Sequence, residues 1–181
     1  MLNTSMNLAG LAALVMLACP AAAPTHESGR GEADSDPLVS LHGARSSVAK
    51  LRYERITTKE AWNKLWSEHA AGKSTKDHVV HSSTPTIDFK RCMVVAVFSG
   101  PAWNCDGHYV ESTSDEGSHL RIRFDSYTYQ TMGPDGGGQS VQPFGIWILP
   151  RSRKEILLEE NVQGTLGAPP VWKEKQRWPA L

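Results

Sequence analysis

Apolar and polar residues follow two different periods along this chain, which predicts a helix followed by strands. Between Thr57 and Gly72 the apolar side chains recur every three or four residues, the spacing of one helix face. A capping box formed by Thr57 and Glu60 marks the expected start of the helix. The residues of the apolar face are Trp62, Leu65, Trp66 and His69. Two tryptophans on one face indicate that the helix packs on a core.

After residue 86 the pattern changes to the period of strands. Residues 92–98 are continuously apolar, which is typical of a central strand covered on both faces. Residues 120–124 alternate between apolar and charged side chains, which indicates a strand with one buried face. Further strands are expected at residues 48–56, 108–112, 144–149 and 155–159. We therefore expect an α+β fold, a single domain with a mainly antiparallel β-sheet meander and one amphipathic helix packed on it.

The chain of 181 residues suits one domain, and its composition changes along the length. An eleven-residue apolar run at residues 8–18 is too short to span a membrane and is typical of an export signal, so residues 1–23 are assigned as a signal or lipoprotein signal segment. Residues 24–47 are rich in Gly, Ser, Pro, Asp and Glu, which predicts a disordered tether. The α+β domain is expected at residues 48–160 and a C-terminal tail at residues 161–181.

Cys19 ends an apolar segment, Met16-Leu17-Ala18-Cys19, that is similar to the bacterial lipobox. In that motif the cysteine is lipidated and becomes the new N-terminus. Lipidation at Cys19 would anchor the domain to a membrane. Ordinary signal cleavage within residues 21–23 is the competing interpretation and would release a soluble protein. Both place the domain outside the cytoplasm, in the periplasm or cell envelope.

The charges exclude one class of partner. Nineteen Lys and Arg residues balance nineteen Asp and Glu residues, and no basic stripe with interleaved aromatics is evident. The chain as a whole therefore has no electrostatic attraction to nucleic acid or to anionic lipid, and nucleic-acid binding is not expected.

Two motifs resemble ligand sites without completing them. Residues 133–140 have the spacing of a phosphate-binding loop, but Gln139 occupies the position of the essential lysine, so a surface loop is expected. Cys105 and His108 have a Cys-x-x-His spacing that His81 or His119 would have to complete as a zinc site. Because no second close pair of ligands exists, no metal and no cofactor are predicted.

No nucleophile stands in a local pattern with a base, so no catalytic residue is predicted. The acidic pairs Asp115-Glu116 and Glu159-Glu160 are interpreted as solvated surface. Cys92 and Cys105 lie at opposite ends of a strand, roughly 20 Å apart, which exceeds disulfide geometry. We therefore expect both to be thiols, with Cys92 buried and Cys105 free or partly exposed.

Several segments together resemble a known family. They are residues 85–89, the apolar strand to Phe98, Gly100, Gly107-His108-Tyr109 and residues 143–151. Over roughly residues 85–160 the chain is similar to the C-terminal domain family of the protease-complex subunit PrcB. It departs from that family at residues 103–106, where the hairpin loop is longer. The resemblance implies an exported, non-catalytic accessory domain that binds a protease.

Loop placement predicts the binding surface. In a meander, the loops at residues 100–107 and 128–143 share one end of the sheet, and the turns near residues 115–118 and 150–153 share the other. The first two loops carry residue types that supply anchor area at protein interfaces, although some of these side chains would alternatively cover the end of the core. The predicted binding residues are Trp103, Asn104, Tyr109, Tyr127, Tyr129 and Met132.

The sequence thus predicts an exported, lipid-anchored, non-catalytic accessory domain that binds a protein partner. Through the family resemblance, that partner is an extracytoplasmic protease. The alternative is an extracytoplasmic metal-dependent hydrolase that uses Cys105, His108 and one distant histidine.

Overall fold

The computed structural model describes residues 37–71, 84–132, 137–165 and 167–181, and these confirm the expected α+β class. The elements, in chain order, are β1 (Val39–Gly43), β2 (Leu51–Ile56), α1 (Lys59–Ala70), β3 (Cys92–Ser99), β4 (Ala102–Trp103), β5 (Cys105–Asp115), β6 (His119–Thr128), β7 (Ser140–Val141), β8 (Phe144–Pro150), β9 (Glu155–Asn161) and β10 (Trp172–Trp178). The helix found in these residues lacks the length and apolar character of a membrane span.

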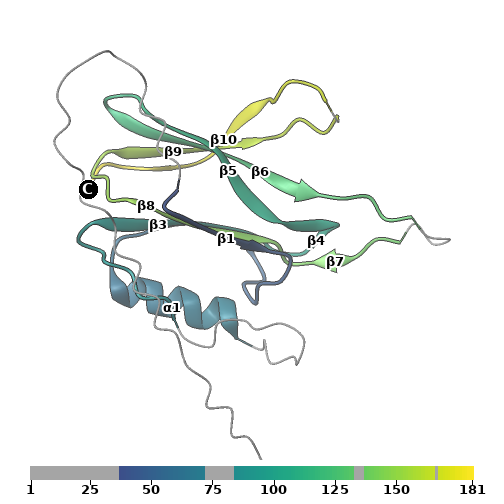
Figure 1. Cartoon of the computed structure of the whole chain (residues 1–181), viewed down its shortest axis with the longest axis horizontal. Coiled ribbons are helices and arrows are strands. Elements are labelled where there is room, and N and C mark those ends of the chain that lie inside the picture. Colours follow the sequence, from purple (N-terminus) through teal and green to yellow (C-terminus); the bar gives the residue numbers. More distant parts are fainter. Residues whose placement is uncertain (1–36, 72–83, 133–136, 166) are drawn as a thin grey trace, which may run out of the picture.

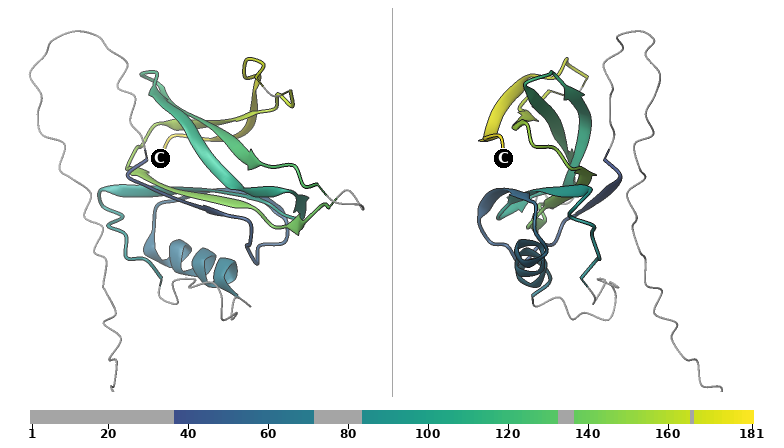
Figure 2. Two further views of the ribbon diagram at one scale, coloured as in Figure 1. Left: turned by 45° about the vertical axis from the view of Figure 1, so that its right-hand side comes forward. Right: turned by 90° about the vertical axis from the view of Figure 1, so that its left-hand side faces the viewer.

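The domain has three layers, a helix and two sheets (Figures 1 and 2). Helix α1 covers one face of a sheet with strand order β1-β8-β3-β2, which we call the helix-side sheet. A second sheet, with strand order β10-β9-β6-β5, packs on its other face, and we call it the outer sheet. A short ribbon of β4 and β7 extends from one end of the domain.

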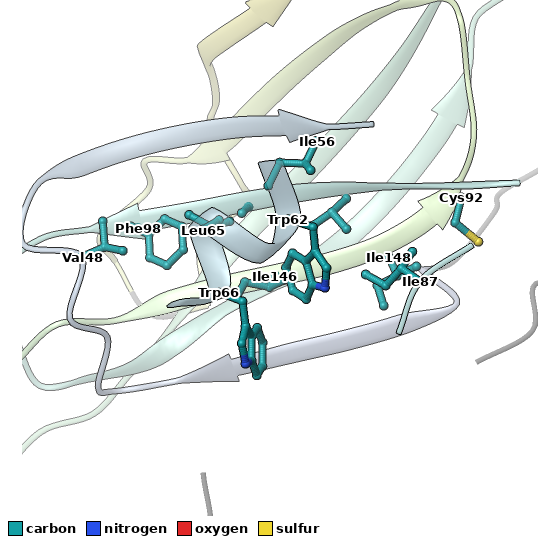
Figure 3. Packing of buried hydrophobic residues seen from close by; sticks show 12 residues of the cluster. Val48, Ile56, Trp62, Leu65, Trp66, Ile87, Cys92, Phe98, Ile146 and Ile148 are labelled. Carbon is teal, nitrogen blue, oxygen red and sulfur yellow. The ribbon is translucent and has the colours of Figure 1, made fainter. Parts of the chain in front are cut away.

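Helix α1 forms over the predicted segment, whose apolar residues lie on one helix face. Thr58, in an extended conformation, is the N-cap and accepts a hydrogen bond from the amide of Ala61 at 3.3 Å. The cap is therefore one residue later than the predicted Thr57, because Thr58 is the residue that turns the chain into the helix. All four residues of the predicted face are buried, namely Trp62, Leu65, Trp66 and His69. Figure 3 shows the first three of them packed in the core.

Strand β3 is the centre of the domain, as its apolar run predicts. Val94, Ala96 and Phe98 pack toward the helix, whereas Met93, Val95 and Val97 pack toward the outer sheet. Strand β6 supplies the opposing face of the inter-sheet core, again as its alternation predicts, with Leu120, Ile122 and Phe124. The two cores therefore share β3, and they also share β8, which places Ile146 and Ile148 in one core and Trp147 and Leu149 in the other.

The expected meander is wrong in its strand neighbours. Strand β8 returns to pair with both β3 and β1, and β9 pairs with β6 in parallel. Local alternation specifies which side chains of a strand are buried, but several apolar strands compete for each neighbouring place. The chain resolves this competition by dividing its strands between two sheets.

The ordered domain is also longer than predicted at both ends. Strand β1 lies within the stretch interpreted as a tether, and it pairs with β8 from Val39 opposite Ile148 to Gly43 opposite Phe144. Strand β10 lies within the stretch interpreted as a tail, where it pairs with β9 and packs Trp178 on the inter-sheet core. Pairing supplies the hydrogen bonds that these polar sequences lack alone. Cys19 and the signal segment lie outside the described residues.

The cysteines are partly as predicted. Cys105 is a free thiol, so no disulfide joins it to Cys92. Cys105 is buried rather than partly exposed, and its Sγ lies 3.5 Å from the carbonyl oxygen of Gly107. Burial raises the pKa of its thiol. Cys92 is buried as expected but is itself disulfide-bonded, so the prediction of a thiol at this position is wrong.

Candidate protein-binding surface

The two long loops meet at one end of the domain, as predicted. Strand β4, in the first loop, pairs with β7, in the second, with Ala102 opposite Val141 and Trp103 opposite Ser140. The turns near residues 115–118 and 150–153 lie at the other end, where Lys154 forms an ion pair with Asp115 at 2.5 Å. Figure 1 shows β4 and β7 at the end opposite the C-terminus.

Strand β5 joins the two sheets at this end because Gly107 allows a close backbone approach. A Cβ atom at Gly107 would lie 2.5 Å from the amide nitrogen of Gly43 and 2.8 Å from the carbonyl oxygen of Phe144. Its φ of +119° is also one that other residues rarely adopt. The start of β5 therefore crosses directly against β1 and β8, and the loop before it is held in place.

Asn104 connects the two loops through its backbone and its side chain. Its backbone is left-handed, with φ of 52°, a conformation that asparagine tolerates better than most residues. Its Oδ1 accepts a hydrogen bond from the amide of Gln139 at 2.7 Å, and its own amide donates to the Gln139 carbonyl at 3.0 Å. Tyr129 donates to the Asn104 carbonyl from its amide and to Gln139 Oε1 from its hydroxyl, both at 3.0 Å.

The remaining predicted side chains are displayed around this connection. Trp103 is 67% exposed, Tyr127 is 44% exposed and Met132 is fully exposed. The ring of Tyr127 stacks on Tyr109 with 4.3 Å between centroids and lies 4.9 Å from the ring of His42. We call Trp103, Tyr109, Tyr127 and Met132 the aromatic end. His42 is an addition that the sequence did not indicate, because the tether was not expected to contain a strand.

A buried histidine lies beneath the aromatic end. His108 Nε2 is 2.8 Å from Ser99 Oγ, and His108 Nδ1 is 2.9 Å from Ser126 Oγ. The Ser99 contact resembles a nucleophile and its base, but burial lowers the pKa of His108 to about 4, and its Nδ1 contacts a serine hydroxyl and no carboxylate of the described residues. Since Ser99 ends β3 and Ser126 belongs to β6, the arrangement joins the two sheets instead.

Among the described residues, the metal ligands of the alternative hydrolase are not brought together. Both ring nitrogens of His108 contact serine hydroxyls, and His119 lies in the outer sheet next to Glu116, 2.8 Å from it. Within the described ranges no group of three His, Cys, Asp or Glu side chains is placed to hold a metal ion. His81 lies outside those ranges.

The loop that resembles a phosphate-binding motif ends in a strand. Residues 133–136 lie outside the described residues, but Gln139 is followed at once by β7, whereas a phosphate-binding loop opens a helix. Gln139 itself holds Asn104 and Tyr129. The predicted surface loop is therefore part of the connection that supports the aromatic end.

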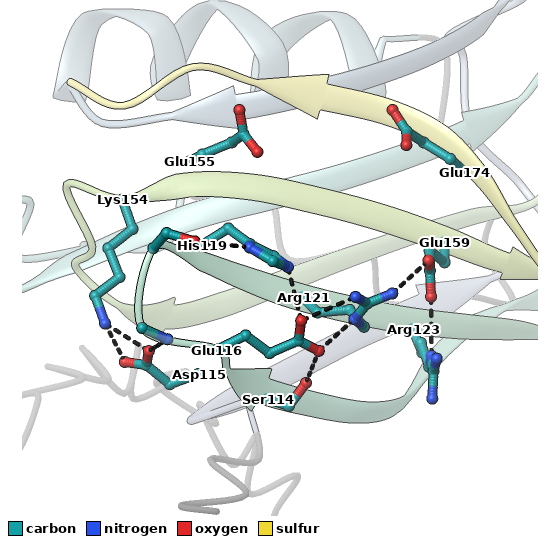
Figure 4. A network of polar contacts seen from close by, with 12 residues as sticks. Ser114, Asp115, Glu116, His119, Arg121, Arg123, Lys154, Glu155, Glu159 and Glu174 are labelled. Atoms are coloured by element: carbon teal, nitrogen blue, oxygen red, sulfur yellow. Dashed lines mark hydrogen bonds and ion pairs between the residues drawn. The ribbon is translucent and has the colours of Figure 1, made fainter.

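The prediction that the Glu159-Glu160 pair is solvated surface is wrong for Glu159. Glu159 is buried on the outer sheet, where its carboxylate oxygens lie 2.6 Å from Arg121 Nη1 and 2.9 Å from Arg123 Nε (Figure 4). Arg121 also binds Glu116, and this hydrogen bond lowers the pKa of Glu116 to about 2. The polar face of β6 carries Arg121 and Arg123, and the parallel pairing of β6 with β9 places both beside Glu159.

The segments that carry the family resemblance occupy core and turn positions of this fold. Residues 85–160 include β3 and β8 of the helix-side sheet and β5, β6 and β9 of the outer sheet. The resemblance to the PrcB family stays a prediction. Comparisons with known protein families, with characterised proteins and with solved structures return no match to this chain.

Proposed function

We propose that this chain is an exported, membrane-tethered accessory domain that binds a protein partner through its aromatic end. The observation that carries the proposal is the exposure of Trp103 at a backbone position held firmly by the β4–β7 pairing and by Asn104. A large rigid side chain loses little entropy when it is buried in a partner, so tryptophan is the residue type most enriched among binding hot spots.

The other side chains of the aromatic end support the same interpretation. Tyr109 and Tyr127 are already stacked on each other, and exposed Met132 adds an adaptable apolar contact. Because the support is built from the paired strands β4 and β7 and from the hydrogen bonds of Asn104, docking requires no refolding of the domain. The family resemblance makes an extracytoplasmic protease the proposed partner.

Replacement of Trp103 by alanine is expected to weaken partner binding by about 2 kcal/mol or more, roughly thirtyfold in dissociation constant. The partner is first identified by crosslinking from a photoreactive residue at exposed position 130, with position 173 as the negative control. Its affinity for the wild type and the Trp103→Ala variant is then measured by titration calorimetry. The melting temperature should change little, because the lost side chain is mostly exposed.

Leu181→Ala is the matched control for this experiment. Leu181 is 62% exposed and lies at the end opposite the aromatic end. Equal affinities of the wild type, Trp103→Ala and Leu181→Ala proteins would remove the aromatic end as the binding surface. A large fall in the melting temperature of Trp103→Ala would instead assign this tryptophan to the core.

The proposed lipid anchor at Cys19 leads to a separate prediction. Cells given labelled palmitate are expected to label the wild type and not Cys19→Ser, because the lipid of a lipobox protein is attached at its cysteine. Mass spectrometry of the mature protein then locates the N-terminus. Since Cys92 is disulfide-bonded and Cys105 is a free thiol, spectra before and after reduction also show whether Cys19 is held by a disulfide. A wild type that begins near Ala22, or whose Cys19 carries a disulfide, contradicts the lipid anchor.

A further inference from the structure

Basic side chains gather at the end of the domain opposite the aromatic end. The backbone amide of Arg151 donates to the carbonyl of Arg91 at 2.7 Å, and the guanidinium of Arg55 donates to the carbonyl of Ser152 at 2.7 Å. These contacts place three segments that are distant in the sequence side by side. We call their cationic residues the basic end, namely Arg55, Lys90, Arg91, Arg151 and Arg153.

The positive charge of the basic end is not neutralised locally. None of its five residues forms an ion pair with a carboxylate in the described part of the chain. Arg55 and Arg151 instead donate to backbone carbonyls, of Ser152 and Pro179 and of Thr57 and Phe89 respectively. Their charges also repel, since Arg151 adds to the lowering of the Arg55 pKa that burial causes.

Neighbouring acids are largely engaged elsewhere. Asp115 pairs with Lys154, and Glu155 pairs with Arg177. Asp88 is the acid within the segments of the basic end, and its Oδ1 accepts a hydrogen bond from the Lys90 amide at 3.0 Å. The basic end therefore keeps an excess of positive charge even though the whole chain is neutral.

The predicted tether enters the domain at the basic end. The amide of Leu38 donates to the carbonyl of Ile148 at 2.9 Å, two residues before β8 ends at Pro150 and Arg151 follows. From there β1 runs toward the aromatic end, where Gly43 pairs with Phe144. Cys19 is 18 positions before residue 37, a length of chain that spans at most roughly 60 Å. A lipid on Cys19 would thus be attached through the basic end, where the chain enters the domain.

We propose that the basic end docks on an anionic phospholipid surface, with exposed Lys90, Arg91 and Arg153 contacting headgroup phosphates. The lipid is favoured over another anion because the tether and the unpaired cations lie at the same end. Basic residues near an anionic bilayer each strengthen binding about fivefold. In this orientation the aromatic end faces away from the membrane and is open to a partner. The biological setting rests on the proposed tether, but the surface can be tested without it.

The test uses the chain from residue 19 onward, produced without lipid, which contains every described residue and all three cysteines and lacks the apolar run at residues 8–18. Sedimentation with vesicles is measured for an equimolar mixture of phosphatidylcholine and phosphatidylglycerol and for pure phosphatidylcholine. We expect binding to the mixed vesicles alone, released as salt is added. Combined replacement of Lys90, Arg91 and Arg153 by glutamate should weaken this binding by about a hundredfold or more.

The matched control carries Lys50→Glu, Lys64→Glu and Lys173→Glu. These exposed lysines also form no ion pair in the described ranges, so the control has the same net charge with an intact basic end. Equal weakening in both triple variants, equal binding to both vesicle types, or no binding to the mixed vesicles would overturn the docking surface. Because the assay contains no lipid anchor, each of these results leaves the palmitate labelling of Cys19 and the proposed function standing.

Discussion

Truncation of Trp62 to alanine is expected to lower the free energy of unfolding by about 3–5 kcal/mol. Trp62 is 1% exposed and lies between α1 and the helix-side sheet (Figure 3). Its indole nitrogen also donates to the carbonyl of Pro85 at 2.8 Å, so the substitution creates a cavity and leaves that acceptor without its donor. Urea unfolding followed by circular dichroism measures the change, since the midpoint should fall while the denaturant dependence stays constant.

Trp103→Ala is the control for this prediction, because it removes the same atoms from a largely exposed position. Its unfolding free energy should stay within about 0.5 kcal/mol of the wild type. If Trp62→Ala were as stable as Trp103→Ala, the helix would not be packed as described. The apolar face of α1 would then be available as a second docking surface.

Acidification is expected to destabilise the domain through His108 by about 3 kcal/mol between pH 6.5 and pH 4. His108 is 2% exposed, and burial lowers its pKa to about 4, whereas the unfolded chain has an ordinary histidine pKa near 6.5. Between pH 6.5 and pH 4, His108 is therefore protonated in the unfolded state and neutral in the folded state. The contribution of His108 to the free energy of unfolding is fully present above pH 6.5. It decreases as the pH falls toward 4 and changes no further below pH 4.

The serine contacts give the structural reason for this pH dependence. A neutral imidazole donates one hydrogen bond and accepts one, and so matches two hydroxyl groups, Ser99 and Ser126. Protonation would make both nitrogens donors and force one hydroxyl to reorient beside the ring of Phe124, whose centroid is 5.8 Å away.

The measurement compares wild type and His108→Gln at a series of pH values. Contributions of other titrating groups are shared, so the stability difference between the two proteins should shrink as the pH falls from 6.5 to 4. Nuclear magnetic resonance titration of the native His108 ring gives its pKa directly and does not depend on how the variant folds. Parallel stability curves, or a native pKa near 6.5, would contradict the structural role assigned to this histidine.

The two proposed surfaces give the domain a direction. The basic end, with its positive charge, lies near the N-terminal end of β1. The aromatic end, with its exposed apolar side chains, lies near the C-terminal end of the same strand. A tethered protein of this form would sit on the membrane and hold its binding side chains away from it. The vesicle assay and the Trp103 experiment test the two ends independently.

Much of the candidate surface follows from the sequence, because loop composition is a local property. The long loops, their shared end and the exposure of Trp103 and Met132 agree with the prediction. The sequence did not predict that the Asn104 side chain accepts a hydrogen bond from the amide of Gln139, because these two residues are distant in the sequence. His42 was also missed, because its strand gains stability only by pairing with β8.

The sequence by itself determined the type of the central elements and their buried faces. The periodicities of α1, β3 and β6 record how side chains alternate about a local backbone, and no distant contact is needed to interpret them. Tertiary structure alone decided which strands are neighbours, and it recruited β1 and β10 from polar segments. It also created the basic end within a neutral chain, since charges cancel in a sum over residues but attract a surface only where the fold brings them together.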